Sequence, residues 1–201
     1  HFTMSYVLRY AGLLREATAE CERARSKDPK SSGWRSCGIP YLLLGDIRRA
    51  KDYFDLDAGS VWSGNVAVTV LMRQGRFDEA LRVAEATSNS DAWWIKVKLG
   101  IVRVSHEELE AKAKNAMEST VWPRDGEPLY FASLTPAYCG VNHQALQLLR
   151  AAIDLDYCGY PAIDDDPAFN SLRNLPKFKQ IRQAAIDCQQ RFLRFRSQIP
   201  P

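Results

Sequence analysis

The stretch Trp-Arg-Ser-Cys-Gly-Ile-Pro-Tyr, residues 34–41, decides how the rest of the chain is interpreted. Cys37 has no second cysteine two or three residues away, so the spacing of a Cys-x-x-Cys redox motif is absent. Residues 34, 37, 38 and 41 are three or four positions apart and therefore share one face of a helix. We expect Cys37 to pack between helices and Gly38 to let a neighbouring helix come close. Trp34 and Tyr41 would fill the space beside them.

Copies of one local pattern occur along the chain. Residues 12–24, 45–55 and 75–86 each have a glycine, an aromatic or aliphatic residue two positions later, and an alanine five positions after the glycine. Residues 140–152 form a fourth copy with the same glycine and alanine. The aligned alanines are separated by 33, 30 and 65 residues, and they are Ala17, Ala50, Ala80 and Ala145. Because 65 is about two periods, one degenerate copy fits between the last two.

The hydrophobic periodicity is helical nearly everywhere, which predicts an all-α fold. The run Val66–Met72 has the composition of a strand but leads directly into an amphipathic segment after Gly75, so we interpret it as a buried helix. We expect helix pairs at about 1–28, 33–57, 62–87, 91–119 and 127–155. In the fourth, degenerate pair, Ser105 and Glu108 are expected to form a capping box.

A period of about 34 residues, with this motif, resembles the tetratricopeptide repeat. The repeat pattern Trp-x2-Leu-Gly-x2-Tyr, then Ala-x3-Phe, is matched by Trp34, Gly38, Tyr41, Ala50 and Phe54, with Cys37 at the position of the leucine. The resemblance implies a right-handed solenoid of antiparallel helix pairs over residues 1–155. Pro40 departs from the pattern because it removes a backbone hydrogen bond, so we expect a kink or a helix that starts late.

Residues 156–201 are expected to form a C-terminal cap. Asp166 and Pro167 suit the start of a short helix, and Pro176 opens a long amphipathic helix at about 176–198. This ending resembles the C-terminal tetratricopeptide domain of bacterial multidomain kinases and transcriptional regulators. The first half of the long helix would cover the last repeat. Its second half carries apolar residues that would be exposed and could mediate self-association or homodimer formation, namely Phe192, Phe195 and Ile199.

Composition places few limits on function. The 201 residues carry a net charge of +3, and no apolar run is long enough to cross a bilayer. We therefore infer neither nucleic-acid contact nor a membrane segment. The five cysteines are irregularly spaced, which favours free thiols in a core over a disulfide framework. The cytoplasm is favoured, and the periplasm would require a transmembrane helix upstream. Because the chain starts at His1, we expect a fragment of a longer protein.

Motifs for catalysis, metal binding or nucleotide binding are absent from the sequence. Its three histidines are isolated, and no paired Cys-x2-Cys, His-x3-His or Gly-x-Gly-x2-Gly occurs. The acidic run Asp164–Asp166 lacks the alternating ligands of a calcium loop, and capping of the next helix explains it more simply. We therefore expect no cofactor, no metal and no enzymatic activity.

The resemblance implies that a concave groove, lined by the first helix of each pair, binds the partner. The positions that would face it are Tyr6, Arg9, Tyr10, Arg35, Ile39, Leu42, Leu43, Asn65, Thr69, Met72, Arg73, Tyr130, Leu134, Ala137 and Tyr138. Aromatic, aliphatic and basic side chains are typical of interfaces. Each of them could instead pack against its neighbours. The family's carboxylate-clamping pattern of Lys and Asn is not met.

Two functions are consistent with this pattern. The first is a non-catalytic module that binds a protein, a peptide or an upstream domain of its own chain. The second is a ligand-sensing regulatory domain that controls an attached kinase or DNA-binding domain. An attached output domain in the full-length gene would favour the second.

Overall fold

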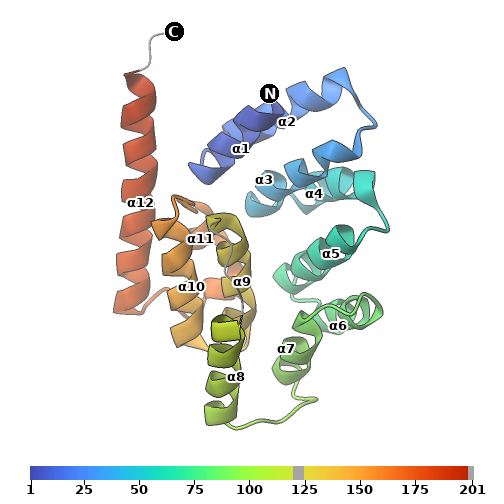
Figure 1. Ribbon diagram of the computed structural model, residues 1–201, viewed down its shortest axis with the longest axis vertical. Coiled ribbons are helices and arrows are strands. Elements are labelled where there is room, and N and C mark those ends of the chain that lie inside the picture. The colour runs from blue at the N-terminus through green and yellow to red at the C-terminus, as the bar shows by residue number, and fades with distance from the viewer. Residues whose placement is uncertain (120–124, 199–201) are drawn as a thin grey trace. The chain divides into compact units, whose positions relative to one another are not determined.

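The computed structural model describes residues 1–119 and 125–198, with side chains described outside 116–119. Within these ranges the secondary structure is helical and no β-strand occurs, which confirms the all-α prediction. The Val66–Met72 run lies inside the helix Val61–Arg73, so its interpretation as a helix rather than a strand is also confirmed. Figure 1 shows successive short helices joined by tight turns.

Two compact units make up the chain. The first contains residues 1–9 and 13–95, and the second contains residues 10–12 and 96–201. The C-terminal helix Pro176–Ser197 packs on the helix Asn142–Asp154, so residues before and after position 155 belong to the same unit.

Helices of the first unit are α1 (Phe2–Tyr10), α2 (Leu14–Lys27), the 3-10 helix η1 (Ser32–Cys37), α3 (Gly38–Leu43), α4 (Ile47–Phe54), η2 (Asp55–Asp57), α5 (Val61–Arg73) and α6 (Phe77–Ala86). The helix α7 (Asp91–Lys98) spans the division between the units. The second unit continues with α8 (His106–Ser119), α9 (Gly126–Tyr138), α10 (Asn142–Asp154), α11 (Ala162–Asp165), η3 (Pro167–Phe169) and α12 (Pro176–Ser197).

Four helix–helix turns have the same backbone geometry. Each contains a glycine in the left-handed region, with φ between 72° and 79°: Gly12, Gly45, Gly75 and Gly140. The N–H of the next residue donates to the carbonyl five positions back at 2.8–2.9 Å, in the pairs Leu13–Leu8, Asp46–Tyr41, Arg76–Leu71 and Val141–Pro136. This is the hydrogen bond of a Schellman motif, which ends a helix on a glycine because other residues are strained there. The same turn thus joins α1 to α2, α3 to α4, α5 to α6, and α9 to α10.

The packing positions around these turns are also shared. The alanine five residues after each glycine is the fourth residue of the second helix and has no exposed surface: Ala17, Ala50, Ala80 and Ala145. The residue seven positions before each glycine is buried and not large: Ser5, Gly38, Val68 and Ser133. Small side chains at both positions allow the two helices of a pair to approach closely.

Gly38 lies directly against the second helix of its pair. A Cβ atom built on it would come within 2.1 Å of Cε1 of Phe54 and 2.7 Å of the carbonyl oxygen of Ala50. Tyr41 is buried beside it, whereas Trp34 is half-buried in η1. Residues 34, 37, 38 and 41 were expected to lie on one helix, but that helix is broken, since η1 ends at Cys37 and α3 begins at Gly38. This agrees with the expectation that Pro40 delays the start of the helix.

The first two helix pairs are joined through Glu22 of α2. Its Oε1 atom accepts hydrogen bonds from the hydroxyls of Tyr41 at 2.6 Å and Tyr53 at 2.9 Å, and from Nη2 of Arg49. The rings of Tyr41 and Tyr53 are stacked, with centroids 5.6 Å apart. Burial alone raises the pKa of Glu22, but the three hydrogen bonds outweigh this effect and lower the pKa below its ordinary value.

The expected degenerate copy keeps the turn but lengthens the connection. Gly100 has φ of 71°, and the N–H of Ile101 donates to the carbonyl of Lys96 at 2.9 Å, as in the other four turns. The next helix, α8, starts only at His106. Its capping box is confirmed, because Ser105 N–H donates to Glu108 Oε2 at 2.7 Å and Glu108 N–H donates to Ser105 Oγ at 3.1 Å.

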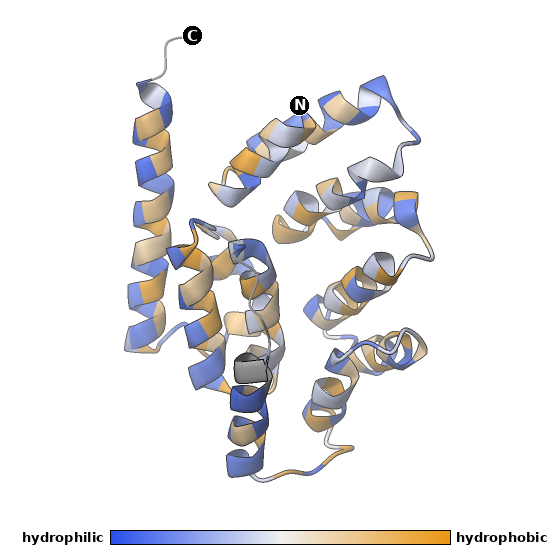
Figure 2. Ribbon diagram, viewed as in Figure 1, coloured by the Kyte–Doolittle hydropathy of each residue, from blue (hydrophilic) through white to orange (hydrophobic). Residues whose placement is uncertain are grey.

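The C-terminal segment is organised by one buried carboxylate and one long helix. Asp166 accepts a hydrogen bond from the N–H of Ala168 at 3.0 Å, which confirms its predicted capping role at the start of η3. Figure 2 shows hydrophobic and hydrophilic residues alternating along α12. The buried residues of α12 are Phe178, Ile181, Ala185 and Cys188.

The expectation of free cysteines in the core is wrong for four of the five. Cys21 of α2 is bonded to Cys37 of η1, and Cys158, after α10, is bonded to Cys188 of α12. Cys139 lies outside both disulfides. The sequence did not reveal the pairs because their partners are 16 and 30 residues apart and belong to elements that only the fold brings together.

Candidate binding site

The expected groove residues differ widely in accessibility. Asn65 is exposed on α5. Six others are half-buried: Tyr6, Tyr10, Arg35, Thr69, Arg73 and Tyr138. The remaining eight are buried and present little surface to a partner: Arg9, Ile39, Leu42, Leu43, Met72, Tyr130, Leu134 and Ala137. The residues that stay accessible on first helices therefore come mainly from α1 and α5.

Additional exposed apolar residues lie on the same first helices. Met4 and Val7 on α1 are 51% and 45% exposed, and Val61 at the start of α5 is 74% exposed. Sequence reasoning missed them because it transferred positions from the repeat pattern, and none of these three residues occupies a transferred position. In the second unit, Tyr138 lines a pocket of about 430 Å³ together with Val97 and Lys98 at the end of α7.

Residues proposed for self-association lie at the end of α12. Phe192 is half-buried and Phe195 is 64% exposed, while Ile199 lies outside the described residues. The change from buried to exposed apolar side chains occurs after Cys188, as the length of the helix led us to expect. Self-association itself stays a prediction.

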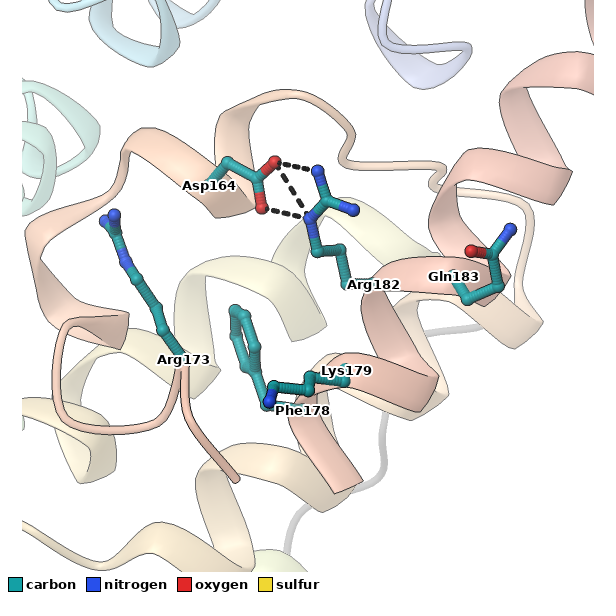
Figure 3. A pocket seen from close by; sticks show the side chains of 6 residues that line it. All are labelled: Asp164, Arg173, Phe178, Lys179, Arg182 and Gln183. Atoms are coloured by element: carbon teal, nitrogen blue, oxygen red, sulfur yellow. Dashed lines mark hydrogen bonds and ion pairs between the residues drawn. The ribbon is translucent and has the colours of Figure 1, made fainter. Parts of the chain in front are cut away.

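A second pocket of about 500 Å³ lies on the C-terminal segment (Figure 3). It is lined by more charged side chains than the pocket beside Tyr138. It is lined by Asp164 of α11, by Arg173 in the turn after η3, and by four residues of α12, namely Phe178, Lys179, Arg182 and Gln183. In the view of Figure 3 the guanidinium groups of Arg173 and Arg182 stand on either side of the Phe178 ring. Three cationic side chains, one carboxylate and one aromatic ring thus line the same pocket.

Asp164 and Arg182 form a bidentate ion pair across this pocket. Arg182 Nε donates to Asp164 Oδ1 at 2.8 Å, and its Nη2 donates to Oδ2 at 2.7 Å. The hydrogen bond to Asp164 raises the pKa of the Arg182 guanidinium above its ordinary value. The guanidinium carbon also lies 5.4 Å from the centroid of the Tyr160 ring. These contacts fix Arg182 in place, so that this wall of the pocket is preorganised.

The other two cations, Arg173 and Lys179, have fewer hydrogen-bond and ion-pair partners than Arg182. Arg173 Nη2 donates to the backbone carbonyl of Asp166 at 3.2 Å, but its buried Nε has no hydrogen-bond partner among the described residues. The Lys179 side chain is exposed and forms no ion pair with a residue that the structure describes. The pocket therefore keeps unused hydrogen-bond donors and positive charge.

The sequence held a weak signal for this pocket. Lys179, Arg182 and Gln183 are spaced to share one face of a helix, but Arg173 and Asp164 reach it only through the fold. The acidic run 164–166 was assigned to capping as a whole. In the structure Asp166 caps η3, whereas Asp164 pairs with Arg182.

Two comparisons with known proteins were negative. Neither the models of known protein families nor the curated proteins include a match to this chain. Among the described residues, no helix combines the length and hydropathy needed to span a membrane. The same part of the chain contains no cluster of three or more His, Cys, Asp or Glu side chains suited to a metal ion.

Proposed function

We propose that the chain is a non-catalytic binding module, built from tetratricopeptide-like helix pairs, that docks a protein or peptide along the first helices of the pairs. The observation that carries this proposal is the fourfold occurrence of one helical hairpin, with a glycine of positive φ and a fully buried alanine five residues later. Repeated hairpins of this kind bury their faces against neighbours and leave an extended surface for binding.

The accessible residues of α1 and α5 support this assignment. Met4, Val7 and Val61 are exposed apolar side chains, and Tyr6 and Asn65 lie on the same two helices. Large exposed apolar side chains, accompanied by aromatic and amide groups, are typical of surfaces that bind another protein.

Site-specific photo-crosslinking tests the proposal. A benzophenone amino acid is placed at Asn65 on the first helix α5, and at Arg82, an exposed residue of the second helix α6, as the matched control. In extracts of cells that express the protein, we expect a discrete crosslinked polypeptide from position 65, competed by unlabelled chain, and none from position 82. Equal crosslinking from both positions, or none from either, would contradict the proposal.

A further inference from the structure

We propose that the pocket formed by Arg173, Lys179 and Arg182 binds a carboxylate side chain of an acidic peptide segment. This inference rests on the proposed function, since it names the chemistry of the partner. The pocket has a volume of about 500 Å³, which is large enough for an acidic side chain together with part of its backbone.

The charges of the pocket favour an anion. Its lining contains three cations and only one carboxylate, and both oxygens of Asp164 are already bonded to Arg182. Arg173 contributes a guanidinium to the pocket wall, and Lys179 contributes an exposed ammonium group without an ion pair to a described residue. A carboxylate can accept hydrogen bonds from cationic groups of this kind, and hydrogen bonds between charged partners are stronger than those between neutral ones.

Two residues that line the pocket, Phe178 and Arg182, are held in fixed positions, unlike the mobile side chains of an open charged surface. Phe178, at the base of α12, is almost fully buried, and Arg182 is held by its ion pair and by the Tyr160 ring. Because Arg182 is already held in place, its ordering adds little to the entropic cost of binding. The Nε2 atom of Gln183 donates to Asp187 Oδ1 at 2.9 Å, which leaves its amide oxygen to accept from a peptide N–H.

Fluorescence anisotropy of a labelled Glu–Gly repeat peptide tests the proposal on the full chain. We expect Lys179→Gln and Arg173→Gln each to weaken binding by roughly five- to tenfold. The matched controls Lys177→Gln and Arg194→Gln remove the same charge from exposed positions of α12 that do not line the pocket, and should change binding by less than about twofold. Circular dichroism of each variant checks that it is folded.

Two results would overturn the proposal. One is equal weakening by Lys177→Gln and Lys179→Gln, which would show only general attraction to a basic surface. The other is displacement of the peptide by inorganic phosphate at a lower concentration than by acetate, which would assign the pocket to phosphate groups. If either result is obtained while crosslinking from Asn65 is still observed, the pocket proposal fails and the proposed function stands.

We also infer, from the disulfides and independently of the pocket, that this chain matures in an oxidising compartment. Cys21 and Cys37 have Cα atoms 5.7 Å apart, and Cys158 and Cys188 have Cα atoms 5.3 Å apart. Both separations are those of ordinary disulfides, and all four residues are buried. Cytosolic thiols are kept reduced, whereas structural disulfides accumulate in oxidising compartments.

Each bond joins two elements of one unit. Cys21–Cys37 joins the first helix pair to the second, and Cys158–Cys188 ties α12 to the segment after α10. Formation of each bond removes two protons and two electrons from a pair of thiols. The oxidant is a protein disulfide, which exchanges with the thiols and is itself reduced to two thiols.

Thiol counting in native cells tests this inference. Cells are quenched with acid, and the denatured protein is labelled with a maleimide polymer before or after reduction. We expect one label without reduction, at Cys139, and five after it. The double variant Cys21→Ser/Cys37→Ser should still take one label without reduction, because only one pair is lost with it. Five labels on the unreduced wild-type chain would overturn the inference.

Discussion

Arg9 Nη1 donates a hydrogen bond of 2.9 Å to the backbone carbonyl of Ser36, which lies 27 positions further along the chain. Ser36 is four residues before Pro40, whose ring nitrogen has no hydrogen to give to that carbonyl. Arg9 is 1% exposed, and its guanidinium lies 4.1 Å from the centroid of the Tyr6 ring. The first helix thus supplies a donor at the place where the proline removes one.

Replacement of Arg9 by Met should therefore destabilise the protein. The half-buried Ser36 carbonyl would lose a charged donor, and the expected loss of stability is roughly 1–3 kcal/mol. Arg23→Met is the control, since Arg23 is exposed and, among the described residues, forms its ion pair with Glu20 on its own helix, a contact worth about 0–1 kcal/mol. Urea unfolding of both variants gives the comparison, and equal losses would contradict the role assigned to Arg9.

The shared turn makes a prediction about three glycines at once. Gly45, Gly75 and Gly140 have φ of 79°, 72° and 79°, and a Cβ built on any of them meets no atom within 4 Å. Alanine at each position should cost about 1–2 kcal/mol through backbone strain alone. Gly33→Ala, where φ is not in the left-handed region and only the Ser31 hydroxyl is near, should cost less. Chemical denaturation that shows no penalty at the three turns would refute the common hairpin.

The fold class, the helix–helix turns and the helix caps could be predicted from sequence because they depend on local spacing. The all-helical class followed from periodicity, and the turn glycines with their alanines were visible as a recurring pattern at positions such as 45 and 50. The capping residues Ser105 and Asp166 were identified for the same reason, since a cap bonds within three residues of itself.

Features that depend on contacts between distant segments could not be predicted in this way. Each disulfide joins cysteines on different elements, and no spacing rule pairs Cys158 with Cys188. The basic pocket likewise needs the turn that carries Arg173 to fold back onto α12. The groove positions were transferred from an uninterrupted helix, whereas Pro40 and the 3-10 helix before it shorten α3 and leave all six of its residues buried.

Acid should weaken the contact between the first two helix pairs. The hydrogen bonds from Tyr41, Tyr53 and Arg49 lower the pKa of Glu22 despite its partial burial, so the carboxylate stabilises the folded state above its unfolded pKa. This contribution is lost as the pH falls below 4.5 and through the lowered pKa. We expect Glu22→Gln to be less stable than wild type near neutral pH, with a difference that shrinks on acidification. Thermal melts over this range provide the test, and a difference that grows with acid would contradict it.

We predict that the distal half of α12 mediates self-association. Phe195 is 64% exposed beyond the last buried residue of the helix, Cys188. Light scattering of wild type should show dimers or larger species, and Phe195→Glu should shift the population to monomers without lowering the melting temperature. Arg194→Glu serves as a control for the added acidic charge. If wild type and Phe195→Glu are both monomers of equal stability, this part of the helix is a solvated end.

Hydrogen–deuterium exchange tests the central claim most directly. The polypeptide captured by crosslinking at Asn65 is purified, and exchange of the full chain is followed with and without it. The account predicts slower exchange in peptides from the first helices α1 and α5, with little change in the second helices α2 and α6. Protection confined to α2 and α6, or no protection anywhere at saturating partner, would contradict a module that binds along its first helices.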